Sequence, residues 1–427
     1  MVNVPGISIN PLEDTVTEEY IHILKTLSPK YLRYPEGEIS QNYWATAPSW
    51  DPSTARYINK GVWPANDTRF VKDGKPKMFN LRVFLELCEN LDAIPIIIVP
   101  VNSMYGKWKT PYNDILSNAV KLVEYIGNRD VIYEIGNETT LGKSPSGNTD
   151  ILTFAKDAGR IINGMVKVNP KAKCIVGGKS STEWTWVSRI PGIFGIVAHN
   201  YPGHSVDKWL ARDGIFLVKN LEECKVAIGK KEMFITETSA TNFTDQPNDV
   251  GMALMTADLL LNSMQFSECV VLWTTKWSVG EIKPSSAYSL LHPSNDLTCT
   301  GVVCMLISLA VYVIGDDCKI TKETPTKFKF SGNGKTSYAI INKSNKPEKV
   351  NTKKAHYSMY GSLKSTTPGY SVNTQVMEPY SLKRVYLIYD MTILSIIYRL
   401  SLLSIYMYID KMSFDHGRVA VRHSWKT

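Results

Sequence analysis

The chain has 427 residues, of which 44% are hydrophobic and 21% charged, a composition typical of a globular protein. This length allows one large domain of about 250–300 residues and a smaller one. The net charge of +8 comes from residues 316–427, which hold 18 Lys and Arg against 8 Asp and Glu, whereas residues 1–315 hold 30 against 32. No recognised nucleic-acid-binding module accompanies this charge, so we expect no nucleic-acid partner.

The seven cysteines are scattered, and no pair has CxxC spacing with a nearby His. This pattern excludes a disulfide scaffold and predicts no zinc site. We expect no metal and no organic cofactor. The first ten residues, MVNVPGISIN, lack the basic region and apolar core of a signal peptide, and the compartment stays open.

From residue 5 to about residue 275, short apolar runs alternate with segments of helical periodicity, as in Ile115–Ile126, where Leu116, Val120 and Val123 share a face. Buried strands alternating with helices are typical of a parallel sheet covered on both faces. Eight of them predict a (β/α)8 TIM barrel in the α/β class. A doubly wound open sheet is the alternative, but its phosphate-binding signature is absent. The eight runs are Gly6–Ile9, Tyr31–Tyr34, Ile94–Val99, Val131–Ile135, Cys174–Val176, Gly195–His199, Met233–Thr236 and Cys269–Thr274.

Polar and aromatic side chains stand where these runs end, which is the edge of a barrel that carries its active site. Two of them are carboxylates, Glu138 after the fourth run and Glu237 after the seventh. Glycoside hydrolysis needs such a pair, one to protonate the leaving oxygen and one to attack or stabilise the sugar cation. The other candidates are Arg33, Asn102, Asn137, His199, Tyr201 and Trp277.

After Leu309 the pattern changes to short strands separated by polar turns, with a GNG hairpin at 332–334. We predict a barrel over residues 1–312, a small antiparallel β-sandwich over 313–390 and a hydrophobic, basic extension over 391–427. Within the extension, Met391–Ile409 is nineteen mostly apolar residues interrupted by Arg399. This stretch is long enough to span a membrane, although an Arg at the centre of a bilayer costs free energy. The alternatives are a poorly ordered extension and a packed helix.

Several of these segments resemble the retaining clan-A glycoside hydrolases, in particular α-L-arabinofuranosidase-like and heparanase-like (β-glucuronidase) members. YEIGNE at 133–138 is similar to their WEIGNE acid/base motif, and ITETS at 235–239 to the heparanase-like nucleophile motif. LRYPEGEISQNYW at 32–44 resembles their LR-[FY]-PGG segment, and HNY at 199–201 their HYY. A further likeness, to the last strand of their β-sandwich, is found in MEPYSLKRVYL near the C-terminus, so the resemblance spans about residues 5–390.

The resemblance implies a carbohydrate substrate and double displacement, with Glu138 as acid/base and Glu237 as nucleophile. We expect partial desolvation to raise the pKa of Glu138 so that it holds a proton. Glu134 lies about 13 Å further down the strand and is expected to be structural. Arg33 and Tyr201 are predicted to donate hydrogen bonds to Glu237. Asn137 is predicted to bind the sugar 2-hydroxyl, and Asn102, His199 and Trp277 to line the pocket.

Two features depart from the resemblance. Glu36 stands where the family usually has Gly, and the sandwich strand that often precedes the barrel is missing. These departures leave a non-catalytic glycan-binding barrel as the alternative function, although a pure binder has no need of two carboxylates. A membrane-bound structural protein is a weaker alternative that rests on Met391–Ile409 alone. Related enzymes are commonly extracellular or lysosomal.

Overall fold

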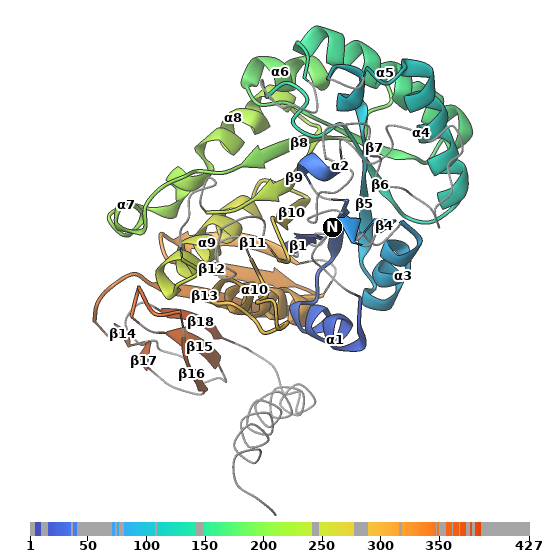
Figure 1. Ribbon diagram of the computed structural model, residues 1–427. Helices are drawn as coiled ribbons and strands as arrows, with labels where there is room; N and C mark the ends of the chain where they lie inside the picture. The colour runs from blue at the N-terminus through green and yellow to red at the C-terminus, as the bar shows by residue number, and fades with distance from the viewer. Residues whose placement is uncertain are drawn as a thin grey trace, which may run out of the picture. The chain divides into compact units, whose positions relative to one another are not determined.

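Eight parallel strands close into a barrel in the computed structural model, in the order β1-β10-β9-β8-β7-β6-β5-β2 (Figure 1). This confirms the predicted (β/α)8 fold, and each predicted run coincides with one strand. The strands are β1 (Pro5–Ser8), β2 (Tyr31–Tyr34), β5 (Ile94–Val99), β6 (Ile132–Ile135), β7 (Lys173–Gly177), β8 (Gly195–Asn200), β9 (Glu232–Thr238) and β10 (Cys269–Leu272). The structure describes residues 5–385 except 10–15, 36, 41–70, 73–74, 77–80, 107–108, 142–147, 241–246, 277–288, 316–317, 347, 350–355, 361, 367, 373–375 and 378–380.

Helices surround the barrel, and several begin at side-chain caps. Asp150, Ser180, Asp249 and Thr298 each accept a hydrogen bond from a backbone N–H in the first turn of α5, α6, α9 and α10. The helices and 3-10 turns are α1 (Glu18–Leu27), α2 (Gly37–Ser40), α3 (Leu81–Leu91), η1 (Val101–Met104), α4 (Tyr112–Ile126), α5 (Ile151–Val168), α6 (Ser181–Val187), α7 (Val206–Leu210), η2 (Gly214–Val218), α8 (Lys219–Ile228), α9 (Val250–Ser263) and α10 (Cys299–Ile314). A small hairpin pairs β3 (Val71–Lys72) with β4 (Lys75–Pro76).

The C-terminal part is an antiparallel six-stranded sheet in the order β11-β12-β13-β18-β15-β16, with a two-stranded β14-β17 sheet. The hairpin predicted at GNG joins β12 to β13 through Asn333 and Gly334, whose positive φ values of 49° and 70° suit a tight hairpin turn. The strands are β11 (Lys319–Thr324), β12 (Lys327–Gly332), β13 (Lys335–Asn342), β14 (Glu348–Lys349), β15 (His356–Tyr360), β16 (Gly369–Val372), β17 (Val376–Met377) and β18 (Ser381–Val385).

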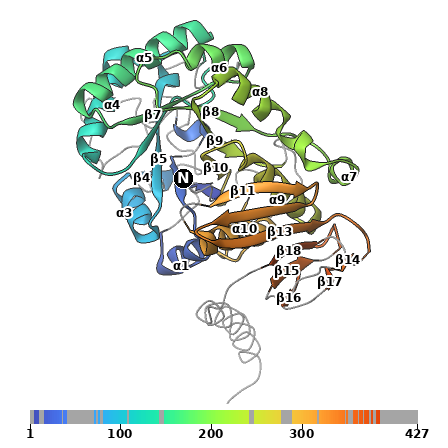
Figure 2. The same ribbon diagram turned by 180° about the vertical axis from the view of Figure 1, so that it is seen from behind.

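This sheet packs on the barrel through α9 and α10, with β12 and β13 against α10 (Figure 2). A buried ion pair joins the two parts, because Lys343 Nζ lies 2.6 Å from Asp258 Oδ2 on α9. Asp258 is fully buried and also accepts from the indole N–H of Trp209 at 2.7 Å. The ammonium of Lys343 lies 4.5 Å from the centre of the Trp209 ring. The charge of Asp258 is therefore compensated by one residue of the sheet.

The last barrel helix ends at Ile314 and the C-terminal sheet begins at Lys319. The boundaries predicted at 312 and 390 stay predictions. The segment 391–427, with its apolar stretch 391–409, lies outside the described residues. Within the part of the chain that the structure describes, none of the helices combines the length and the apolar character needed to span a bilayer.

Candidate active site

The inward positions of the barrel strands form an apolar layer with a polar layer above it. The apolar layer is one buried cluster drawn from seven strands, and Tyr31, Ile132 and Val197 belong to it. Side chains two residues along a strand point to the same face. Arg33 and Glu134 therefore point into the barrel mouth above this layer. His199 lies at the same level on β8, and together they form the floor of the candidate site.

Arg33 is the centre of this floor and is fully buried. Its Nε donates to Glu134 Oε2 at 2.7 Å, and its Nη2 donates to Glu134 Oε1 at 2.9 Å and to Asn137 Oδ1 at 2.7 Å. Its Nη1 donates to Glu237 Oε1 at 2.5 Å. One guanidinium thus fixes three side chains from two other strands. The hydrogen bonds of Glu134 to Arg33 agree with the expected structural role. The expected separation of about 13 Å from Glu138 is wrong, because β6 ends at Ile135 and the turn that follows brings both carboxylates to the imidazole of His199.

A bulge in β9 directs Glu237 into the site. Phe234 pairs with Val197 and Glu237 pairs with His199, so β9 takes three residues where β8 takes two. The register of β9 against β10 has the same offset. Without the extra residue, Phe234 and Thr236 would face the interior and Glu237 would face outward. The bulge lets Thr236 and Glu237 both point inward, which is a common use of bulges near active sites.

Glu138 is held by a tight turn after β6. Its φ of 49° lies in the left-handed region, which is uncommon for a residue with a side chain. The fully buried amide of Asn102 fixes this turn, donating to Asn137 O at 2.8 Å and accepting from Asn137 N at 3.2 Å and Thr139 Oγ1 at 2.8 Å. A Cβ on Gly136 would lie 2.3 Å from Thr139 Oγ1. Asn102 therefore lies beneath the turn, and we propose that it positions Glu138.

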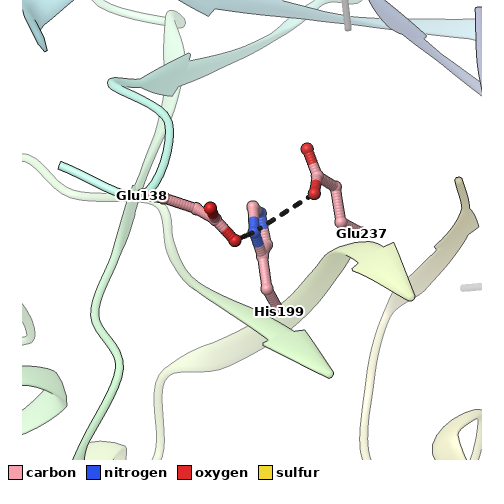
Figure 3. Close-up of side chains that lie close together, drawn as sticks. All are labelled: Glu138, His199 and Glu237. Atoms are coloured by element: carbon pink, nitrogen blue, oxygen red, sulfur yellow. Dashed lines mark hydrogen bonds and ion pairs between the residues drawn. The ribbon is translucent and has the colours of Figure 1, made fainter. Parts of the chain in front are cut away.

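His199 stands between the two carboxylates (Figure 3). Its Nδ1 lies 2.9 Å from Glu138 Oε1 and 3.5 Å from Glu237 Oε2, and its Nε2 lies 3.2 Å from Thr236 Oγ1. One oxygen of Glu138, one of Glu237 and the His199 nitrogen all lie within 4.8 Å of one another. The two carboxyl groups predicted from the sequence thus meet across a short gap.

The charges of this cluster shift its pKa values. Burial would lower the pKa of His199, but the charge of Glu237 and hydrogen bonds to Glu134 and Glu138 raise it to about 10. Burial would raise the pKa of Glu134, but Arg33 and His199 lower it to about 2. The pKa of Glu138 also falls below its usual value of 4.5, because His199 and Arg33 outweigh the effect of burial. The expectation of a raised pKa for Glu138 is therefore wrong, since it left out the neighbouring imidazole.

The hydrogen bonds around His199 allow two positions for one proton. Thr236 Oγ1 donates to Glu134 Oε1 at 3.1 Å, which leaves its oxygen to accept from Nε2–H of His199. Between Nδ1 and Glu138 there is room for one proton, on the imidazole or on the carboxyl group. Three such side chains could also ligate a metal ion, but a metal-bound His must be neutral.

Two further residues contact Glu237. Tyr201 Oη donates to Glu237 Oε2 at 2.9 Å, so both donors predicted from the sequence reach this carboxylate. Gly37 was not predicted, yet a Cβ at this position would lie 2.9 Å from Glu237 Oε1. The signal was present in the PEGE segment, where the glycine follows Glu36. Glu36 itself and Trp277, the predicted platform, lie outside the described residues.

A cavity of about 350 Å³ opens from the acid side of the cluster. It reaches from Glu138, His199 and Tyr201 toward the loop after β7 and toward α6. The sequence did not predict this part of the cavity, because nothing in the segment GGKSS at 177–181 or in the helix that follows it indicates a binding function. The residues that line this part of the cavity include Leu141, Phe154, Gly178, Lys179, Trp184 and Asn220.

Comparison with known proteins finds likeness at the level of structure. No protein-family model matches the chain, and no curated protein is significantly similar in sequence. An α-L-arabinofuranosidase from Thermotoga maritima, solved with arabinose, superposes with a TM-score of 0.63 at 16% identity over 90% of this chain and 96% of that one. A family 51 α-L-arabinofuranosidase from Bifidobacterium longum gives 0.59 at 11% identity, over 91% and 97%. A monomeric β-xylosidase from Caulobacter crescentus gives 0.58 at 11%, over 90% and 95%.

The chain shares the fold of these glycosidases. The likeness extends over 90% or more of both chains in each comparison. The structural neighbours agree with the arabinofuranosidase-like side of the sequence resemblance, and β-xylosidases join them. At identities of 11–16%, the likeness establishes architecture, and the chemistry rests on the site itself.

Proposed function

We propose that the chain is a retaining glycoside hydrolase in which Glu237 is the nucleophile and Glu138 the general acid/base. The observation that carries this proposal is the approach of the two carboxyl groups to within 4.8 Å. Retaining enzymes place this pair about 5–5.5 Å apart, whereas inverting enzymes leave a wider gap for a water molecule. The donors on Glu237 support its role, because Arg33 and Tyr201 hold its carboxylate in one orientation.

In the first step, Glu237 attacks the anomeric carbon while Glu138 gives its proton to the departing glycosidic oxygen. The bond between carbon and leaving oxygen breaks, and a covalent glycosyl-enzyme forms on Glu237. In the second step, Glu138 takes a proton from water, whose oxygen attacks the same carbon and releases Glu237. The configuration at the anomeric carbon is inverted twice and so retained.

The contact between His199 and Glu138 supplies the proton for the first step. In the free site the proton lies on His199, because the pKa of its imidazole is about 10 and that of Glu138 is lowered. Transfer across the 2.9 Å contact gives neutral imidazole and a protonated Glu138. A sugar that displaces water from the cavity disfavours separated charges, which favours the transfer.

The identity of the sugar that is transferred to Glu237 is to be determined by assay. The structural neighbours include arabinofuranosidases and a β-xylosidase, and the sequence resemblance adds β-glucuronidase-like enzymes. Asn137, which the sequence assigns to the sugar 2-hydroxyl, has its Oδ1 held by Arg33. Aryl arabinofuranoside, xyloside, glucoside and glucuronide, assayed between pH 4 and 7, would identify the glycone.

Substitution of the two carboxylates tests the mechanism. We expect Glu237→Ala to abolish turnover and added azide to restore some of it, with a product of inverted configuration, because azide then attacks in a single displacement. We expect Glu138→Ala to slow glycosides with poor leaving groups far more than activated aryl glycosides, which need no protonation. Activity of Glu237→Ala at the native level would end the nucleophile assignment. Binding of glycans without turnover of any panel member would favour the non-catalytic alternative.

A further inference from the structure

A buried amide lies between two residues of the candidate site. Asn200 ends β8 and is 2% exposed, and its neighbours His199 and Tyr201 both contact Glu237. Because successive side chains of a strand point to opposite faces, the side chain of Asn200 points outward while that of His199 points into the barrel mouth. The outward amide donates from Nδ2 to the backbone oxygen of Leu217 in η2 at 3.0 Å. The HYY motif that this segment resembles has Tyr at the middle position, so the amide is a feature of this chain.

The backbone of Asn200 is bonded to the strand that carries Glu237. Thr238 Oγ1 donates to the carbonyl oxygen of Asn200 at 2.7 Å, and the two residues pair in register between β8 and β9. Thr238 is fully buried and directly follows Glu237 in the chain. Asn200 thus precedes Tyr201, one partner of the hydrogen bond between Tyr201 and Glu237, and is bonded to the neighbour of the other partner.

The residues just before η2 are held by two lysines of the C-terminal sheet. Lys322 of β11 donates to Asp213 Oδ1, and the same oxygen accepts from the backbone N–H of Ile215 at 3.0 Å. Lys343, which follows β13, donates to the backbone oxygen of Arg212 at 3.2 Å. Two consecutive residues therefore bind the sheet, one through its side chain and one through its backbone.

Helix α9 takes part in the same contacts. Gly214, the first residue of η2, lies so close to Asp258 that a Cβ on the glycine would be 2.2 Å from Asp258 Oδ2. Asn262 donates to Asp258 Oδ1 at 2.8 Å and accepts from Lys322 Nζ at 3.1 Å. Lys343 forms the ion pair with Asp258. Each lysine thus joins α9 to the residues before η2. Because a short 3-10 turn has few hydrogen bonds of its own, these contacts determine where η2 lies.

We propose that the C-terminal sheet positions Tyr201 against Glu237, through Lys322, η2 and the amide of Asn200. This inference rests on the proposed function, because it concerns a donor to the proposed nucleophile. Lys322 and Asn200 are positioning residues, since neither touches the reacting atoms. Without the lysine or the amide, the end of β8 is held less firmly and the hydroxyl of Tyr201 is displaced from the carboxylate. A displacement of about 1 Å near reacting groups can cost about 100-fold in rate.

A double-mutant cycle tests whether Asn200 acts through Tyr201. The four proteins are the native chain, Asn200→Ala, Tyr201→Phe and the double variant, and the measurement is kcat on an aryl glycoside of the sugar that the panel identifies. We expect Asn200→Ala to lower kcat about 10-fold in the native chain, as for loss of one buried hydrogen bond. In Tyr201→Phe the hydroxyl to be positioned is already absent, so the further loss should be less than about 2-fold. The matched control is Asn169→Ala, because Asn169 Nδ2 also donates to a backbone oxygen at 3.0 Å, that of Gly127 at the end of α4.

Lys322→Met tests the contribution of the sheet in the same cycle, and it replaces Asn200→Ala if that variant does not fold. Its matched control is Lys327→Met, which removes a lysine of the neighbouring strand that lies 2.7 Å from Glu323. We expect Lys322→Met to lower kcat about 5-fold in the native chain and less than about 2-fold in Tyr201→Phe. Both control variants should change kcat by less than about 2-fold in either background.

Equal fold losses in the native chain and in Tyr201→Phe would overturn the proposal, because the two residues would then act independently. An unchanged kcat in Lys322→Met would overturn the role of the sheet, and an unchanged kcat in Asn200→Ala would overturn the role of the amide. Failure of the native chain to cleave any aryl glycoside of the panel would instead refute the proposed hydrolase function.

Discussion

Replacement of His199 by Gln should change the pH range in which the enzyme works. In the native chain, Nδ1 of His199 lies 2.9 Å from Glu138 and Nε2 lies 3.2 Å from Thr236. The Gln amide has a similar reach and can hydrogen bond, but it cannot take up a proton. The variant therefore removes the imidazole that holds the shared proton and keeps a polar side chain between the two carboxylates.

The size of the effect follows from the pKa values. His199 and Glu138 share one proton, and the pKa of His199 near 10 means that the pair keeps it until the pH approaches that value. In the variant, Glu138 must hold the proton alone. The usual pKa of its carboxyl group is 4.5; burial raises this pKa and the charge of Arg33 lowers it. Since activity is lost when the acid loses its proton, we expect the alkaline limb of kcat/KM to move down by roughly 5 pH units, from about 10 toward 4.5.

The assay is kcat/KM against pH on a glycoside with a poor leaving group, whose cleavage needs the proton. The control is His204→Gln, because His204 contacts Lys208 outside the cluster. The stability of the folded chain gives a second measurement. The folded pKa of His199 is above its unfolded value, so its contribution is complete below pH 6.5 and is lost as the pH rises toward 10. That alkaline loss should shrink in His199→Gln. An alkaline limb at the same pH in native chain and variant would refute the shared proton.

Three further substitutions have expected outcomes. Gly37→Ala places a methyl group 2.9 Å from Glu237 Oε1, so we expect kcat to fall about 100-fold while circular dichroism stays native. Tyr201→Phe removes a donor to Glu237, and kcat should fall by about 10- to 100-fold; an unchanged kcat would count against this donor. Lys343→Met leaves Asp258 buried without its cation and should lower the free energy of unfolding by about 3 kcal/mol in urea titration. A loss below about 1 kcal/mol there would contradict the role of the ion pair.

The barrel could be predicted because its signals are local. Parallel strands covered on both faces need runs of apolar residues, as in Ile94–Val99. Helix caps and hairpin turns depend on residues that are neighbours in the chain, as with Asp150 before α5 and with Asn333-Gly334. The two carboxylates could be placed at strand ends for the same reason. The sequence also resembles known motifs around them, which made the assignment of roles more specific than periodicity alone allows.

The geometry between strands could not be predicted in this way. The bulge that turns Glu237 inward appears only in the pairing of β9 with its neighbours. The lowered pKa of Glu138 depends on His199, which is 61 residues away in the chain. Asn102 was expected to contact substrate because it follows a strand, but its amide is used by the turn that carries Glu138. Trp184 lines the cavity on α6, which contacts the loop after β6 where Thr140 Oγ1 donates to Glu183 Oε2.

In the proposed mechanism, Glu237 forms a covalent bond to the sugar. Incubation with a 2-deoxy-2-fluoro glycoside that carries an activated leaving group should trap this intermediate, because the fluorine slows its hydrolysis more than its formation. Mass spectrometry of the intact chain and of its peptides measures the result directly. We predict one added glycosyl unit, located on Glu237 and absent in Glu237→Ala. A label on another residue, or turnover of the parent glycoside with inverted configuration, would contradict the account.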